Sequence, residues 1–126
     1  MNKLKKNQTG VILLLTMFIL TGILVVTLGA ADIIFSGIKM NRLTGYSSVA
    51  FFSAEAGLER ALWEARKNGY VPPDSDQSNI FSNILSNGSS YQINNIFDPL
   101  NPNKVIFKSI GSYSGVKRSV ESTYEE

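Results

Sequence analysis

The stretch that decides the fold of this chain is residues 11–31, VILLLTMFILTGILVVTLGAA, which follow the short segment MNKLKKNQTG. The run begins at Val11, ends at Ala31 and carries no charged residue. As an α-helix it would be about 32 Å long, close to the roughly 30 Å hydrocarbon core of a bilayer. We therefore expect a membrane-spanning helix. The first charge after it, Asp32, then falls at the far interface, where an ionised group costs less than at the bilayer centre.

The charges on the two sides of the run predict its orientation. Lys3, Lys5 and Lys6 precede it, and a short basic segment favours a cytoplasmic N-terminus. Lys39 and Arg42 on the other side weaken this asymmetry without reversing it. We predict a single-pass protein of the cytoplasmic membrane, with its N-terminus inside and its head exported.

Three interpretations of the apolar run remain open. It could be a secretory signal cut after the small residues at 29–31, although it is longer than the roughly 7–15 apolar residues usual there. It could be a plain, uncut membrane anchor. It could also follow a leader that ends at Gly10, so that cleavage before Val11 leaves the helix on the mature protein. The sequence KKNQTG directly before VILLL fits this third interpretation well.

The helical signal continues past the apolar run, because no proline occurs before residue 72. We predict one helix over 11–68, capped by Asn68 and Gly69. Its second half should cover a core with a stripe at 3- and 4-residue spacing: Phe51, Ala54, Leu58, Ala61, Leu62 and Ala65, with Ser53, Arg60, Glu64 and Lys67 opposite. A second apolar patch, formed by Phe52, Ala56 and Trp63, would pack either on a neighbouring subunit or on the protein's own head.

The remaining residues predict a small head of antiparallel strands. We expect a polar linker over 70–90 with a short helix at 79–85, a turn at 87–88, and strands over 90–97, 104–113 and 116–124. Ser114 and Gly115 would close the hairpin 104–124, so that Tyr113 pairs with Val116. The fold class is α+β, with a leader at 1–10, a transmembrane or filament-core helix at 11–38, an extracytoplasmic helical half at 39–69 and a β-rich head at 70–126.

The composition leaves little for catalysis or metal binding. The chain has no cysteine and no histidine, which removes disulfides, thiolate nucleophiles and zinc sites built on those residues. Glu55 and Glu59 are four residues apart on one helix edge, where a solvated stripe or a subunit contact is the better interpretation than acid–base chemistry. We predict no enzyme activity, catalytic residue, metal or cofactor. No basic block predicts nucleic-acid contact.

With its short basic leader, long apolar helix and small β-rich head, the chain resembles the type IV pilin superfamily. Residues 1–65 resemble the N-terminal domain of PilX-type minor pilins, because FFSAEAGLERAL contains the motif Ala54, Glu55, Ala56 and Gly57. The resemblance implies that a prepilin peptidase cuts after Gly10 and methylates the new amino group at Val11. It also implies that the helix leaves the lipid bilayer for a filament, with other pilins, minor pilins and an inner-membrane assembly platform as partners.

One residue departs from that pattern. Major pilins carry a glutamate at the fifth mature position, which here is Leu15, and K-type pseudopilins of type II secretion resemble this chain in lacking it. We expect a minor subunit that assembles, initiates or caps a type IV pilus or a type II secretion pseudopilus, with subunit contacts at Phe52, Trp63, Glu55 and Glu59. The alternative is an uncleaved single-pass membrane protein with an extracytoplasmic binding or sensing head.

Overall fold

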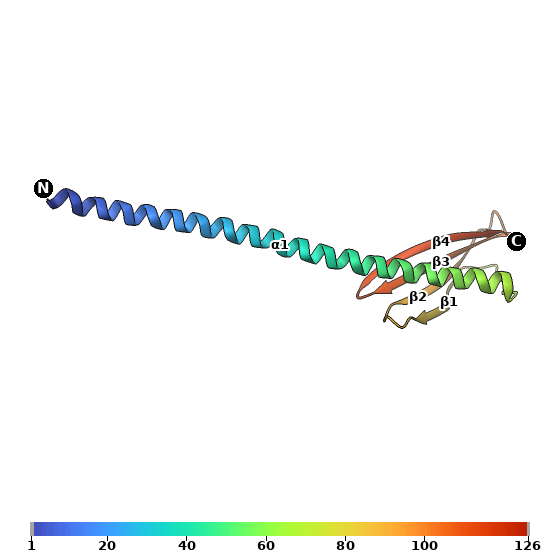
Figure 1. Ribbon diagram of the computed structural model, residues 1–126. Helices are drawn as coiled ribbons and strands as arrows, with labels where there is room; N and C mark the ends of the chain where they lie inside the picture. The colour runs from blue at the N-terminus through green and yellow to red at the C-terminus, as the bar shows by residue number, and fades with distance from the viewer. Residues whose placement is uncertain (1, 126) are drawn as a thin grey trace. The chain divides into compact units, whose positions relative to one another are not determined.

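The computed structural model describes the backbone of residues 2–125 and the side chains of residues 10–125. One helix precedes four strands (Figure 1): α1 (Asn2–Lys67), β1 (Gln77–Ile84), β2 (Ser90–Phe97), β3 (Lys104–Tyr113) and β4 (Val116–Glu125). This α+β arrangement confirms the predicted fold class. The chain divides into two compact units between Asn41 and Arg42.

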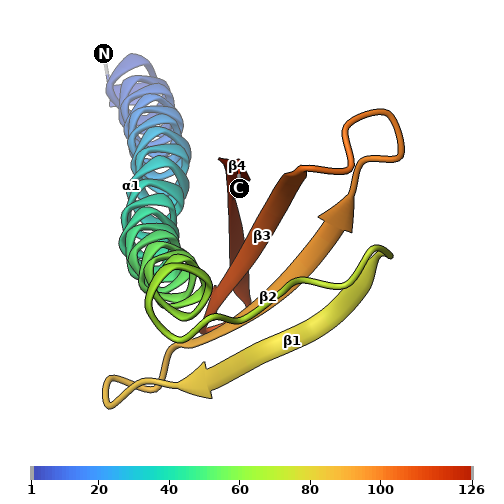
Figure 2. The same cartoon turned by 90° about the vertical axis from the view of Figure 1, so that its right-hand side faces the viewer.

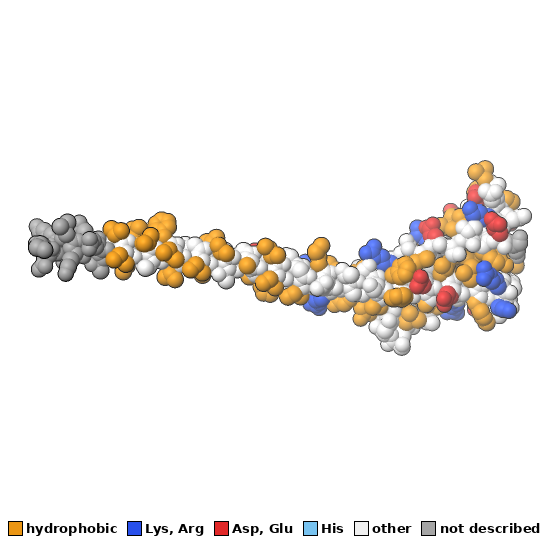
Figure 3. Space-filling view, turned by 45° about the horizontal axis from the view of Figure 1, so that its top comes forward, with side chains coloured by type: hydrophobic (Ala, Val, Ile, Leu, Met, Phe, Trp, Pro, Cys, Tyr) orange, Lys and Arg blue, Asp and Glu red, His pale blue; other side chains and the backbone are white. Residues whose placement is uncertain are grey.

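The first unit consists of the α1 residues up to Asn41. Its large apolar side chains from Val11 onward are exposed, and Figure 3 shows many of them in orange on the visible face. By length and composition, α1 could cross a membrane. Inside residues 11–31 the hydroxyls of Thr16, Thr21 and Thr27 each donate to a carbonyl of the preceding turn, at 2.7–2.8 Å. Their polarity is therefore satisfied within the helix, as a hydrocarbon environment requires. The helix begins at Asn2, nine residues before the predicted start.

The second unit is a four-stranded antiparallel sheet in the order β1-β2-β3-β4, with the last part of α1 over one of its faces (Figure 2). The three strands predicted from the sequence are confirmed. So is the last hairpin, in which Tyr113 pairs with Val116. Ser114 and Gly115 both have positive φ, 47° and 82°, as a two-residue type I′ turn requires.

The predicted short helix at 79–85 was wrong, because residues 77–84 form β1 and are neither a linker nor a helix. The predicted turn at 87–88 is confirmed, and the Gly88 amide donates to the Leu85 carbonyl at 2.9 Å. Phe81 pairs with Ile93 on β2, and its ring lies 5.0 Å from that of Tyr70. The register shifts between Gln77 and Phe81, around the left-handed Asn79 at φ 57°. β1 is thus stabilised by pairing with β2 and by ring packing against Tyr70. Its own sequence lacks the alternation of apolar and polar residues that would predict a strand.

The end of α1 follows the predicted cap. Gly69 has φ 68°, a conformation that glycine adopts without strain, and the Tyr70 amide donates to the Glu64 carbonyl at 3.1 Å. The segment after the cap is tied to the sheet, because the side-chain amide of Asn95 donates to the carbonyls of Pro73 and Ser75. The helix therefore ends where the chain turns back to start β1.

The core between α1 and the sheet is built from small helix residues and large sheet residues. Ala50, Ala54 and Ala61 are fully buried on the helix. Ala61 packs in one cluster with Ile93 and Phe107 on the strands, whereas Ala50 and Ala54 lie close to Gly111 of β3. Two predictions for the helix stripe need correction. Ser53, expected opposite the core, is buried and donates to the Ser90 carbonyl at 2.8 Å, whereas Phe51 lies at the edge and is 40% exposed.

Candidate functional site

The motif at residues 54–57 lies at a close approach of α1 to the sheet. Ala54 and Gly57 are buried against the strands, whereas Glu55 and Ala56 are half-buried. A Cβ at Gly57 would lie 2.5 Å from Ser109 Oγ, and a Cβ at Gly111 would lie 2.5 Å from the Ala54 nitrogen. The small residues of the motif thus position the head on the helix.

Two arginines of α1 contact aromatic rings of the sheet, Arg60 at β1 and β2 and Arg66 at β4. Arg60 donates to the Tyr91 hydroxyl at 3.0 Å, which raises the pKa of Arg60 above its ordinary value, and its guanidinium lies 5.7 Å from the centre of the Phe81 ring. Arg66 lies 5.5 Å from the centre of the Tyr124 ring. Both contacts are cation–π arrangements, which stabilise partly exposed pairs by about 0.5–1 kcal/mol each. They fix the head against rotation about α1.

On the face of α1 turned away from the sheet, the exposed residues Phe52, Glu59 and Trp63 and the half-buried Ala56 form a ridge, which we call the outer ridge. Phe52 is 65% exposed and Trp63 is 53% exposed. Spacings of seven and four residues bring these aromatic side chains and Glu59 onto one face. The head therefore does not cover the predicted second apolar patch.

Two of the predicted contact residues are carboxylates beside or on this ridge. Among the described residues, neither Glu55 nor Glu59 forms an ion pair. The nearby Arg66 is directed to Tyr124. The predicted contact residues Phe52, Trp63 and Glu59 thus lie on one face, with the half-buried Glu55 beside them. The negative charges of Glu55 and Glu59 are not paired within the described part of the head.

The sequence reasoning missed a basic cluster at the end of the head where the β3–β4 hairpin turns. Arg42 donates to the Tyr46 hydroxyl at 3.4 Å, and this bond lowers the pKa of Tyr46. The Tyr46 ring packs edge-on against Tyr113 at 5.5 Å. Arg118 donates to Ser47 Oγ at 2.6 Å, across 71 residues of sequence. The only sequence signal was the adjacent pair KR at 117–118, whose neighbours depend on the fold.

The second unit has open hollows on its surface, some lined mainly by polar atoms and others mainly by apolar atoms. One of about 580 Å³ lies on the sheet and includes Ser82, Gln92 and Lys117 in its lining. A smaller one of about 390 Å³ lies beside the basic cluster and is lined by Ser47, Ser48, Phe51, Phe52 and Arg118. Within residues 10–125, no cluster of three or more potential His, Cys, Asp or Glu ligands could hold a metal ion.

The predicted processing site lies within α1. The helix runs without a break through Gly10 and Val11, and a Cβ at Gly10 would have no neighbour within 4 Å. Val11 is 68% exposed and Leu15 is 58% exposed, so neither is covered by other described residues. The lysine side chains of the leader lie outside the described side chains.

Comparisons with protein-family models, with curated proteins and with solved structures find no match for this chain.

Proposed function

We propose that this chain is a minor pilin-like structural subunit that takes part in assembling, initiating or capping a type IV pilus or a type II secretion pseudopilus. The observation that carries the proposal is the continuity of α1. A single helix of 66 residues carries an exposed apolar stretch from Val11 onward and ends as the helix that packs on the sheet. A subunit that moves from a bilayer into a filament needs such a helix, because one element must anchor the protein and present its head.

The apolar half of α1 is suited both to a lipid bilayer and to a bundle of neighbouring helices. Residues 11–31 have no cover of their own, so they need either lipid or the helices of neighbouring subunits. The internal hydrogen bonds of Thr16, Thr21 and Thr27 leave no unsatisfied hydroxyl in either setting. Gly22 and Gly29 have open space beside them, and glycine at such positions permits close helix packing.

Two further features support a minor subunit with more than one neighbour. The outer ridge offers two exposed aromatic side chains, the residue types that most often carry the binding energy of an interface. Leu15 supplies no carboxylate for the amino group of an adjacent subunit, and an unpaired buried ammonium would be costly there. We therefore assign the chain to a low-copy or tip position, with other pilins and an inner-membrane platform as partners.

The intact mass of the protein from its native host tests the proposal. Removal of residues 1–10 with one added methyl group at Val11 would support a prepilin-processed subunit. An N-terminus that is intact, or trimmed only of Met1, would overturn the proposal in favour of an uncleaved single-pass membrane protein with a binding or sensing head. Cleavage near residue 31 would instead identify a secretory signal and would also overturn it.

A further inference from the structure

The second unit has a charge asymmetry that the proposed function does not use. The end at which α1 enters the head contains residues 42–50, the β1–β2 turn region 82–92 and the β3–β4 turn region 110–119. Together these segments hold Arg42, Lys117 and Arg118 and no aspartate or glutamate. We call this surface the basic end. Figure 3 shows basic side chains in blue where α1 enters the head.

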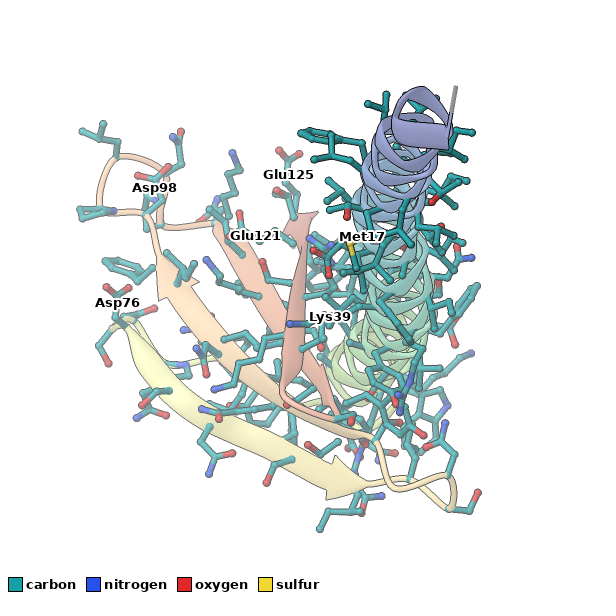
Figure 4. All side chains as sticks on the ribbon, turned by 90° about the vertical axis from the view of Figure 1, so that its left-hand side faces the viewer. Met17, Lys39, Asp76, Asp98, Glu121 and Glu125 are labelled. Carbon is teal, nitrogen blue, oxygen red and sulfur yellow. The ribbon has the colours of Figure 1, made fainter. Side chains whose placement is uncertain are left out.

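The acidic residues of the sheet lie toward the other end. Asp98 follows the end of β2, and Glu125 lies at the end of β4, opposite the start of β3. Asp76 accepts a hydrogen bond from the Phe97 amide, and Glu121 pairs with Lys108 at 3.0 Å. Figure 4 labels these four carboxylates, which lie away from the β3–β4 turn. Lysines and arginines also occur at that end, so only the basic end has charge of a single sign.

The basic end is also the part of the head nearest to the apolar segment along the chain. Ten residues, 32–41, separate the uncharged run from Arg42, so the chain itself tethers the basic end to the membrane segment. Contact between Tyr46 and Tyr113 holds the hairpin turn at the level of Tyr46. Within the head, Lys117 and Arg118 therefore lie near the level of Tyr46, which is four residues or about 6 Å along α1 from Arg42. A charged surface that touches Arg42 would thus lie within roughly a Debye length, ~10 Å at 0.1 M salt, of all three basic residues.

The chemistry beside the charges fits a lipid interface. Tyr46 and Tyr113 are the kind of amphipathic ring that gathers at membrane–water interfaces. The hollow next to Arg118 combines serine hydroxyls with the rings of Phe51 and Phe52, so it offers both polar and apolar contacts. Because the bilayer is tethered to every molecule by α1, its effective concentration at this surface exceeds that of a free acidic protein.

We propose that the basic end docks on anionic lipid head groups while α1 spans the membrane, so that the head is held on the bilayer before it joins an assembly. The proposal rests on the membrane-spanning part of the proposed function and does not depend on leader cleavage. Each basic side chain close to an anionic surface multiplies the docked-to-undocked ratio about fivefold. The three side chains together would change that ratio by about a hundredfold.

The absence of cysteine from the native sequence allows a direct test with the full chain in vesicles. A fluorophore is attached at Ser114→Cys in the β3–β4 turn, and in a second sample at Leu100→Cys, an exposed residue of the β2–β3 loop. Vesicles contain zwitterionic lipid alone or with a third of phosphatidylglycerol, and a quencher is attached to a fraction of the head groups. We expect stronger quenching at residue 114 in the anionic vesicles, no such gain at residue 100, and loss of the gain in 1 M salt.

A charge-matched pair of variants gives the control. Arg42→Glu with Lys117→Glu reverses two charges at the basic end, whereas Lys67→Glu with Lys104→Glu makes the same net change elsewhere on the head. The first pair should abolish the lipid-dependent quenching at residue 114, and the second should preserve at least half of it. Equal quenching in both lipids, or equal effects of both pairs, would overturn the proposal. The proposal would also be overturned if anionic lipid gave no quenching at residue 114 and a salt-sensitive fluorescence change appeared there only after an acidic partner protein was added.

Discussion

Replacing Gly57 by alanine should destabilise the head, although the same change at Gly45 should stabilise it. Both glycines lie inside α1, where alanine is preferred by about 1 kcal/mol, so local propensity predicts a gain at both positions. At Gly45 a Cβ would meet nothing within 4 Å. At Gly57 it would lie 2.5 Å from Ser109 Oγ and 2.7 Å from Tyr91 Cδ2, where ordinary contacts begin at 3.4 Å.

The size of the effect follows from what must move. Ser109 Oγ would have to retreat by about 0.9 Å and the Tyr91 ring by about 0.7 Å, the differences between 3.4 Å and the two distances. The ring cannot swing out freely, because Tyr91 is only 5% exposed and its hydroxyl accepts from Arg60. Overpacking of this kind costs about 3 kcal/mol at the upper end, which leaves a net loss of about 2 kcal/mol after the gain in propensity.

The assay is urea unfolding of the full chain in a mild detergent, and unfolding is monitored by the hydrogen exchange of the β2 and β3 amides. These amides report on the sheet and not on the apolar half of α1. We expect the two variants to differ by about 3 kcal/mol in the free energy of unfolding, with opposite signs relative to the parent. Stabilisation by Gly57→Ala equal to that of Gly45→Ala would refute the close approach of helix and sheet.

Three other outcomes test separate parts of the structure. Ser109→Ala should be neutral or stabilise the head by about 1 kcal/mol in the same unfolding assay, because the buried Ser109 hydroxyl has no partner among the described residues; a loss above 1 kcal/mol would reveal a missed hydrogen bond. Hydrogen bonds from the Asn101 side-chain amide and the Leu100 backbone amide lower the pKa of Asp98, so the Asp98 carboxylate stabilises the loop at any pH above its ordinary pKa of 3.8. That contribution is lost as the pH falls through the lower pKa of the folded state. Asp98→Asn should therefore flatten the dependence of unfolding free energy on pH in this acid range, and an unchanged dependence would contradict the prediction. Trp63→Ala should change the free energy of unfolding by under about 0.5 kcal/mol yet reduce co-purification with partner subunits. The control Leu100→Ala, at a residue that is 89% exposed against 53% for Trp63, should leave co-purification intact. Equal co-purification of the two variants would remove the outer ridge as a subunit contact.

Much of the fold could be predicted from the sequence, because its strongest signals are local. An uncharged run of membrane length, a glycine cap after Lys67 and a Ser-Gly turn between alternating segments each specify their own structure through short-range constraints. The register of the last hairpin followed from the two-residue turn, because a one-residue slip would reverse the face of every side chain.

β1 and the burial of Ser53 could not be predicted in the same way. The segment QSNIFSNI becomes a strand only because β2 offers a free edge and Tyr70 offers a ring for Phe81. Ser53 was placed on the solvent side because it is polar, yet its hydroxyl finds the Ser90 carbonyl 37 residues away. In both cases a partner distant in sequence outweighed the local preference.

The candidate surfaces divide along the same line. The sequence by itself determined an apolar helix that needs lipid or other helices, and it nominated Phe52, Trp63 and Glu59 by their helical spacing. Only the tertiary structure decided that the head leaves these residues exposed and that Arg118 lies beside Ser47. The physical reason is that helical spacing acts over a few residues, whereas burial and charge clustering depend on which distant segments the sheet brings onto α1.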